Sequence, residues 1–207
     1  MKQNLFGRRA LGVGACVALF AALPASAASA ATPPAAATPP AAATTCAEPA
    51  VSQPFLSYKD SNWYTLAPGQ TTDSFNGGEW TLTGGARIVS ATLPSGVTTQ
   101  VLDLPAGSTA VSPAMCVDGN YPTARMQART LGKAPDNTTK FSVQPVGKGA
   151  ATSSMPVLGT TGWNVTPPVN VATAKSGAEQ VTFTFKAGAK AADLQVYDLY
   201  IDPRMCH

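Results

Sequence analysis

Threonine and large apolar residues alternate strictly over residues 181–185 of this 207-residue chain. On an extended backbone Val181, Phe183 and Phe185 point to one side and the two threonines to the other. Valine, threonine and phenylalanine all favour strands. The pattern therefore predicts a strand over residues 179–186 with one buried face, and its period of two excludes a helix there.

The same short, turn-bounded pattern recurs along the chain. Glycine and proline each occur 18 times, and no segment repeats its apolar residues with a sustained helical period. Turn residues at this spacing indicate strands that fold back on one another. We expect an all-β fold, an antiparallel β-sandwich of the jelly-roll type, with a barrel as the alternative. The other predicted strands cover residues 80–83, 87–91, 101–104, 123–131, 140–146, 163–166 and 193–201.

The N-terminus has the pattern of an export signal. The three basic residues among the first nine precede an apolar run over residues 10–23, and small residues at 25–27 offer a cleavage site. The run is shorter than the roughly 20 residues that a membrane-spanning helix needs, and no later segment qualifies. We predict a signal peptide over residues 1–27 and a secreted or cell-envelope protein. General secretion is expected, with twin-arginine export as the alternative.

Removing the signal changes the charge and narrows the function classes. The whole chain carries 14 basic and 11 acidic residues, and three of the basic ones lie in the signal, which leaves 11 of each sign. A mature net charge of zero argues against nucleic-acid partners and against binding to an anionic membrane surface. The single histidine, His207, is the last residue, so Ser-His-Asp catalysis and histidine-based metal centres are not expected.

Residues 28–45 repeat alanine, threonine and proline pairs, a composition that keeps the backbone extended and offers no face to bury. We predict a spacer here, either a disordered leader or a glycosylated stalk. The remaining residues, 46–207, suffice for one β-sandwich domain with its own core.

Three cysteines follow the predicted signal: Cys46, Cys116 and Cys206. In an exported protein a disulfide is the default. We predict a Cys46–Cys116 bond, with Cys46–Cys206 as the alternative. The spare Cys206 leaves two oligomeric states open, a monomer or a dimer bridged through Cys206.

Several stretches spread over residues 46–203 resemble a group of small exported proteins of actinobacterial type whose function is unknown. They cover residues 54–60, 63–69, 79–86, 104–107, 112–117 and 197–203. The same landmarks are similar, more loosely, to galactose-binding-like jelly rolls, the fold of many carbohydrate-binding modules. That resemblance implies carbohydrate binding, no cofactor, and a calcium ligand at Asp198 as the one candidate metal contact. The sequence departs from the family pattern at residues 74–78, which read Ser-Phe-Asn-Gly-Gly where the family often has a Phe-Glu pair.

The predicted strand over residues 123–131 carries a polar stripe. Alternation places Arg125, Gln127 and Arg129 on one face. This face suits binding of a glycan or a uronate. The alternative is that it is only the solvated face of an amphipathic strand. Sugar sites combine such planar polar groups with aromatic rings, and Trp163 and Tyr121 are the candidates we add. Trp80 alternates with Leu82 and is expected in the core instead.

These features favour a non-catalytic exported module that binds extracellular or envelope carbohydrate. The alternatives are a structural cell-surface or assembly protein and a small carbohydrate-active enzyme. Asp198 and Asp202 are the closest acidic pair, but four strand residues separate their side chains by roughly 13 Å, too far for a glycosidase pair. Asp202, which precedes Pro203, is expected to close the last strand.

Overall fold

A computed structural model describes residues 49–117, 120–132, 138–147, 153–157, 159–171 and 179–203. All of them belong to one compact unit that spans Ala43–His207. The predicted signal peptide and spacer, together with Cys46 and Cys206, lie outside the described residues. In the part of the chain that is described, no helix is long and apolar enough to cross a membrane.

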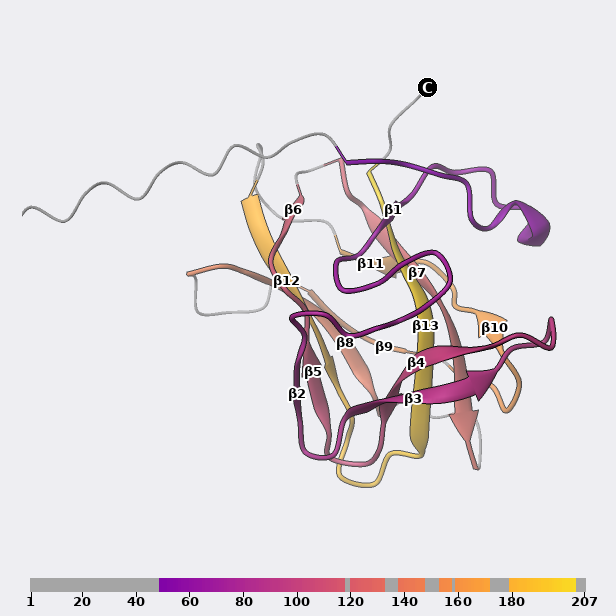
Figure 1. The fold of residues 1–207 in the computed structure, drawn as a ribbon. Helices are drawn as coiled ribbons and strands as arrows, with labels where there is room; N and C mark the ends of the chain where they lie inside the picture. The colour runs from indigo at the N-terminus through magenta and orange to yellow at the C-terminus, as the bar shows by residue number, and fades with distance from the viewer. Residues whose placement is uncertain are drawn as a thin grey trace, which may run out of the picture. The chain divides into compact units, whose positions relative to one another are not determined.

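Seven strands form the first sheet, in the order β10-β7-β13-β4-β3 (Figure 1). The other two strands are short and lie off this path: β1 pairs with β13, and β11 pairs with β7. All pairings between these strands are antiparallel. The bounds are β1 Thr65–Leu66, β3 Arg87–Thr92, β4 Thr98–Leu104, β7 Thr123–Leu131, β10 Asn164–Val165, β11 Val169–Asn170 and β13 Asp193–Asp202.

Six strands form the second sheet, in the order β2-β5-β12-β8-β9, with β6 also paired to β12. Their bounds are β2 Thr81–Thr83, β5 Thr109–Val111, β6 Met115–Val117, β8 Lys140–Pro145, β9 Ser153–Pro156 and β12 Glu179–Lys186. One 3-10 turn, η1 over Leu56–Tyr58, is the helical element of the described chain. The two antiparallel sheets confirm the predicted jelly-roll sandwich.

The main core lies between the two sheets and follows the alternation of the sequence. Val181, Phe183 and Phe185 of β12 are fully buried, whereas the intervening threonines are half-buried. Phe183 stacks on Phe141 of β8 with 5.6 Å between ring centroids. Trp80 is also buried in this core, as expected, and its indole N–H donates to the Pro68 carbonyl oxygen at 2.8 Å.

Most predicted strands appear with nearly the predicted bounds, and β7 and β12 have them exactly as expected. The sequence analysis missed β1, β5, β6, β9 and β11, each of two to four residues. Strands this short show too few alternations to be seen locally. They exist because a longer strand lies beside them, as Thr109–Val111 lies beside β12.

The central strand β13 contains a β-bulge. Its register against β7 shifts between Tyr197 and Tyr200, and Asp198 adopts a left-handed backbone conformation with φ 54°. The extra residue reverses the alternation. Leu194 and Val196 before it and Leu199 and Ile201 after it therefore all face the core, although their sequence positions have opposite parity.

A glutamine side chain completes the hydrogen bonding at this bulge. Along one side of β13, β4 pairs with residues 194–196 and β1 with residues 200 and 201, which leaves Leu199 between them. The Leu199 N–H donates to Gln70 Oε1 at 3.0 Å, and the Leu199 carbonyl oxygen accepts from Gln70 Nε2 at 3.3 Å. The same carbonyl oxygen accepts from the Ala67 N–H at 3.0 Å. Gln70 and Ala67 together thus satisfy backbone groups of Leu199 whose burial would otherwise be costly.

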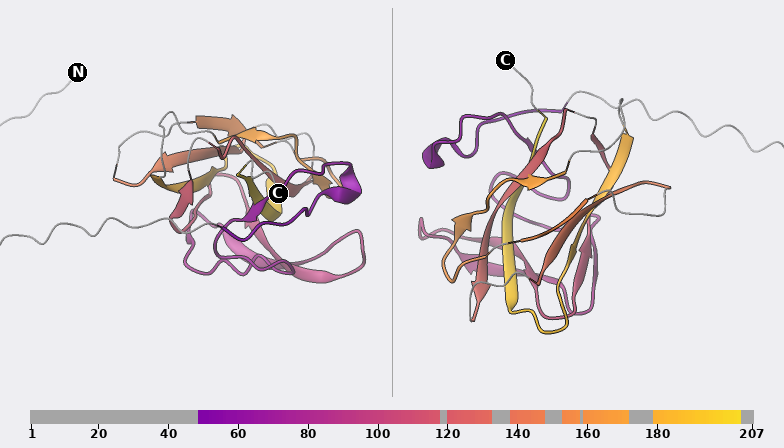
Figure 2. Two further views of the ribbon diagram at one scale, coloured as in Figure 1. Left: turned by 90° about the horizontal axis from the view of Figure 1, so that it is seen from above. Right: turned by 180° about the vertical axis from the view of Figure 1, so that it is seen from behind.

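Three elements lie on the same side of the seven-stranded sheet in every view: η1, the tip of the β3–β4 hairpin, and β10 (Figures 1 and 2). They border the face of this sheet that is turned away from the six-stranded sheet. We call it the outer face; it consists of the outward side chains of β3, β4, β13, β7 and β10.

Exchanging Phe183 for alanine tests the alternation on which the fold depends. Because Phe183 is fully buried between the sheets, Phe183→Ala should lower the free energy of unfolding by about 3–5 kcal/mol. The measurement is urea denaturation followed by tryptophan fluorescence.

Thr184→Ala, at the next position of the same strand, is the matched control, since its side chain points away from the core. Its effect should stay below about 1 kcal/mol. Equal losses in the two variants would contradict the assignment of the two faces of β12.

Candidate functional site

The outer face collects four of the five predicted ligand-binding residues. Arg125, Gln127 and Arg129 alternate along β7 as half-buried side chains, and Trp163 immediately precedes β10. Tyr121 lies apart from them, because it is buried in the core between the sheets with 9% of its surface exposed. The structure therefore removes Tyr121 from the candidate surface.

One row of polar side chains crosses four strands of this face. In it, Arg87 of β3, Asp103 of β4, Gln195 of β13 and Arg129 of β7 are direct cross-strand neighbours. Arg87 Nη2 lies 2.5 Å from Asp103 Oδ2, and Gln195 Nε2 donates to Asp103 Oδ1 at 3.0 Å. Arg129 Nε then donates to Gln195 Oε1 at 2.8 Å. We call these four residues the polar ladder.

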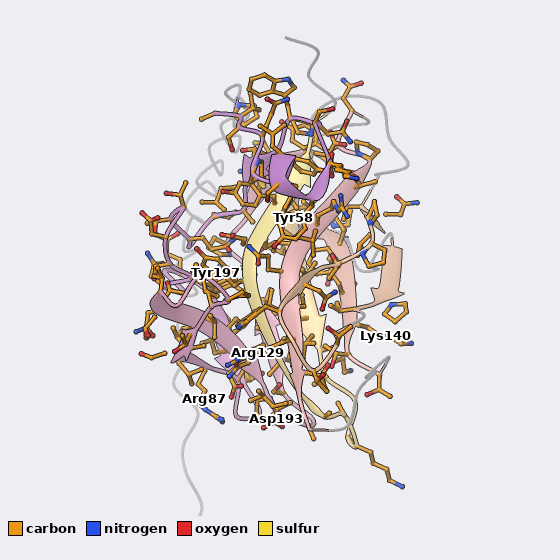
Figure 3. All side chains as sticks on the ribbon, turned by 90° about the vertical axis from the view of Figure 1, so that its right-hand side faces the viewer. Tyr58, Arg87, Arg129, Lys140, Asp193 and Tyr197 are labelled. Atoms are coloured by element: carbon orange, nitrogen blue, oxygen red, sulfur yellow. The ribbon has the colours of Figure 1, made fainter. Side chains whose placement is uncertain are left out.

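The polar ladder joins two guanidiniums through two hydrogen bonds, Arg129 to Gln195 and Gln195 to Asp103, and one ion pair, Asp103 with Arg87. Asp103 is 1% exposed, whereas the Arg87 side chain is 55% exposed. Burying a carboxylate is tolerated only when it is paired and hydrogen-bonded, and here both oxygens of Asp103 have a partner in the ladder. Figure 3 looks onto this face, with Arg87 and Arg129 labelled below Tyr197.

Sequence reasoning missed Arg87, Asp103 and Gln195 as members of the face. One signal was available for Asp103, since it is a charged residue inside the apolar run of residues 101–104. A charge in a strand with buried neighbours implies a fixed partner. The identity of that partner depends on strand register, which the sequence does not show.

Trp163 connects the two edges of the sheet. Its indole N–H donates to the carbonyl oxygen of Thr92, the last residue of β3, at 3.1 Å. Because β3 and the strand that follows Trp163 are at opposite ends of the strand order, this contact requires the sheet to curl toward its outer face. The indole also packs against a small apolar cluster formed by Ala91, Val101 and Tyr197.

The segment before β10 holds Trp163 in place. Thr160 donates through its hydroxyl and its backbone N–H to Asn164 Oδ1, at 2.8 Å and 3.3 Å. Gly159 packs so closely on the sheet that a Cβ atom there would lie 2.5 Å from Thr130 Oγ1. A glycine is therefore required at this close approach. The Arg129 guanidinium lies over the indole ring, 4.8 Å from its centroid.

Arg125 takes part in structural contacts at the other end of β7. Its guanidinium pairs with Asp60, donates to the Thr166 carbonyl oxygen at 3.1 Å, and lies over the Phe55 ring. Burial opposes ionisation of Asp60, yet hydrogen bonds from Tyr64, the Asn62 backbone and Arg125 hold the pKa of this carboxyl below its ordinary value. Arg125 therefore anchors the segment that precedes β1.

Gln127 binds the bulge residue Asp198, its amide donating to Oδ2 at 3.0 Å. The other oxygen, Oδ1, is buried and has no hydrogen-bond partner within the described chain. Burial raises the pKa of Asp198 to about 7, hydrogen bonds from Gln127 and Tyr197 oppose the shift, and the charge of Asp73 adds to it. Asp202 ends β13, as expected, and accepts from the Thr123 hydroxyl at 3.4 Å.

The described residues form no cluster of acidic side chains around Asp198. Calcium takes six to eight oxygen ligands. Within the described ranges no group of three or more histidine, cysteine or acidic side chains is placed to hold a metal ion. The calcium ligand at Asp198 therefore stays a prediction.

Cys116 lies in β6 and is disulfide-bonded. Cys46 and Cys206, the two candidate partners after the predicted signal, lie outside the described residues. The choice between Cys46–Cys116 and the alternatives, and with it a dimer through Cys206, stays a prediction.

Comparison with known proteins finds no protein-family model and no curated protein that matches the chain. Solved structures of low similarity include a xylan-binding CBM22-1 domain from Paenibacillus barcinonensis Xyn10C, with a TM-score of 0.42 and 15% identity over 62% of this chain and 87% of that one. A family 11 carbohydrate-binding module from Clostridium thermocellum gives a TM-score of 0.40 and 9% identity over 70% and 96%.

An arabinose-bound α-L-arabinofuranosidase, MgGH51, gives a TM-score of 0.46 and 10% identity over 69% of this chain and 27% of that chain. At these values the likeness assigns neither a family nor a ligand to this protein.

Asp198 predicts a pH dependence of stability. Its folded-state pKa of about 7 lies above the ordinary value of 3.8, so between these values the folded protein holds a proton that the unfolded chain has lost. The free energy of unfolding should therefore fall as the pH rises from 4 to 7. Asp198→Asn keeps the left-handed backbone accessible and should be more stable than the parent at pH 8, on the order of 2 kcal/mol. At pH 4 the two proteins should be about equally stable.

The measurement is urea denaturation of both proteins at pH 4, 6 and 8. Asp193→Asn makes the same chemical change five positions earlier on the same strand and serves as the control. If the free energy of unfolding falls between pH 4 and 7 by the same amount in Asp198→Asn, the pH dependence belongs to a different group.

Proposed function

We propose that this protein is an exported, non-catalytic binding module for extracellular or envelope carbohydrate, and that the outer face of the seven-stranded sheet is its binding surface. Export rests on the signal-like residues 1–27. Binding rests on the outer face, whose central observation is the polar ladder that ends on the Arg129–Trp163 pair.

The chemistry of the polar ladder suits sugar hydroxyls. Arginine, aspartate and glutamine side chains are planar groups that accept or donate hydrogen bonds in fixed directions. Each one in the ladder is already oriented by its neighbour, so a ligand would meet donors that need little further ordering. Immobilising a freely rotating side chain on binding would otherwise cost about 0.5–1.5 kcal/mol.

Trp163 supplies the apolar half of such a site. Its ring is partly exposed and is fixed at three points: the Thr92 carbonyl oxygen, the Arg129 guanidinium and the apolar cluster of Ala91, Val101 and Tyr197. Aromatic side chains contribute large contact areas at low entropic cost. A rigid indole beside a row of planar polar groups is the arrangement that a sugar ring requires.

Three carboxylates on or beside the outer face support a binding role over a hydrolytic one. Asp103 and Asp60 are both ion-paired, and Asp198 is largely buried in the bulge with Gln127 as its partner. Glycoside hydrolysis needs two carboxyl groups that both reach the scissile bond. These three side chains have partners within the fold, and Asp193 of β13 is the remaining acidic side chain near Arg129 among the described residues, which favours the non-catalytic alternative.

Trp163→Ala tests the proposed surface. Loss of the indole should weaken binding to a responsive polysaccharide at least about tenfold, since it removes apolar contact worth more than 1.4 kcal/mol. Trp163→Phe keeps an aromatic ring but loses the hydrogen bond to Thr92, and should retain most of the affinity. The measurement is affinity electrophoresis against a panel of soluble neutral and acidic polysaccharides, followed by calorimetry on those that bind.

Thermal denaturation of each variant establishes that it remains folded. Full affinity in a folded Trp163→Ala protein would reject this face as the binding surface. Release of reducing sugar from any polymer in the panel would favour the enzyme alternative.

A further inference from the structure

The guanidinium of Arg129 has unused hydrogen-bonding capacity, which sets it apart from the other two arginines of the outer face. Arg87 is ion-paired with Asp103, and Arg125 with Asp60. Among the described residues Arg129 forms a hydrogen bond through Nε alone, which donates to Gln195. Its two terminal nitrogens, Nη1 and Nη2, have no hydrogen-bond partner among the described residues.

The contacts of Arg129 fix the direction in which these nitrogens point. The bond from Nε to Gln195 holds one edge of the planar guanidinium, and its Cζ lies over the Trp163 ring, 4.8 Å from the ring centroid. What remains is the end of the group, where Nη1 and Nη2 present parallel N–H bonds. This end-on pair matches the two oxygens of a carboxylate.

No acidic side chain of the described chain neutralises Arg129. Asp103 is nearly fully buried and already bound to Arg87 and Gln195. Asp193 lies on β13 two residues before Gln195, is half-buried, and makes no ion pair with Arg129. Asp198 lies at the bulge with Gln127. The ladder itself thus carries two positive charges and one negative charge, and the excess is at Arg129.

We propose that Arg129 is a carboxylate-binding subsite and that the carbohydrate recognised by this face contains uronic acid residues. This inference rests on the proposed carbohydrate-binding function. A uronate would place its carboxylate against Nη1 and Nη2 and its pyranose ring beside the Trp163 indole. The two contacts are adjacent because the Arg129 guanidinium lies 4.8 Å from the centroid of the Trp163 ring, so one acidic sugar residue can make both.

The decisive experiment compares each acidic polymer with its own neutral form. Polygalacturonate and alginate are tested beside the same polymers after chemical reduction of their carboxyl groups, which keeps the linkage and removes the charge. The native protein should bind at least one acidic polymer about tenfold or more tightly than its reduced counterpart, as expected for a charge-assisted bidentate contact.

Three variants locate the contact. Arg129→Gln should bring the ratio of acidic to reduced affinity close to one. Arg129→Lys keeps the charge but loses the parallel N–H pair, and should lose most of the preference. Lys140→Gln removes one positive charge from an exposed position of β8 in the other sheet, and should keep the ratio of the native protein.

The outcomes separate this inference from the function on which it rests. Equal binding of acidic and reduced polymers, or binding of neutral glycans alone, overturns the uronate assignment and leaves carbohydrate binding in place. Equal or stronger binding to dextran sulfate shows plain charge attraction and also overturns it. Binding to no polysaccharide overturns both proposals. A preference that survives in a folded Arg129→Gln protein places the carboxylate elsewhere and overturns the Arg129 subsite.

Discussion

The bulge in β13 is the constraint on which both the core and the outer face depend. This strand has neighbours on both sides and is the centre of the seven-stranded sheet. Its apolar residues change parity between Val196 and Leu199, so a regular strand would bury Asp198 in the core and expose Leu199. The left-handed conformation of Asp198 absorbs one residue and lets Leu194, Val196, Leu199 and Ile201 share one face.

The same bulge determines what faces outward. Gln195, Tyr197 and Tyr200 point to the outer face on either side of it, and Asp198 meets Gln127 there. The interruption also breaks the row of strand partners along β13, and there the Gln70 side-chain amide and the Ala67 N–H bind the backbone of Leu199. A local backbone irregularity is thus stabilised by tertiary contacts and in turn positions polar groups, a frequent combination at functional surfaces.

Interactions within the outer face explain why a row of charged and amide groups is stable on a partly buried surface. Asp103 and Asp60 are each paired with an arginine, and the bonds of the polar ladder run from strand to strand, so they order side chains and fix strand register together. Removing one member would leave its neighbour buried without a partner, which is costly. The same ordering leaves Trp163 and the end of the Arg129 guanidinium as the fixed groups of the ladder row that still have capacity for a ligand.

The sequence alone determined the fold class and most of the long strands, because alternation of apolar and polar residues is a local property that sets which face is buried. The two faces of residues 123–131, the core positions of β12 and the burial of Trp80 follow from it. Tyr121 was wrongly grouped with the surface, since an isolated aromatic residue next to a turn carries no period from which to infer its side.

The tertiary structure decided which polar side chains meet. Gln195 bonds to Asp103 across 92 positions and to Arg129 across 66, and Trp163 reaches Thr92 across 71. Such contacts depend on strand order and register, and a shift of one residue would turn every one of these side chains to the other face. Two arginines that look equivalent in the strand over residues 123–131 therefore differ in the folded protein. Arg125 is ion-paired with Asp60, whereas the two terminal nitrogens of Arg129 have no hydrogen-bond partner among the described residues.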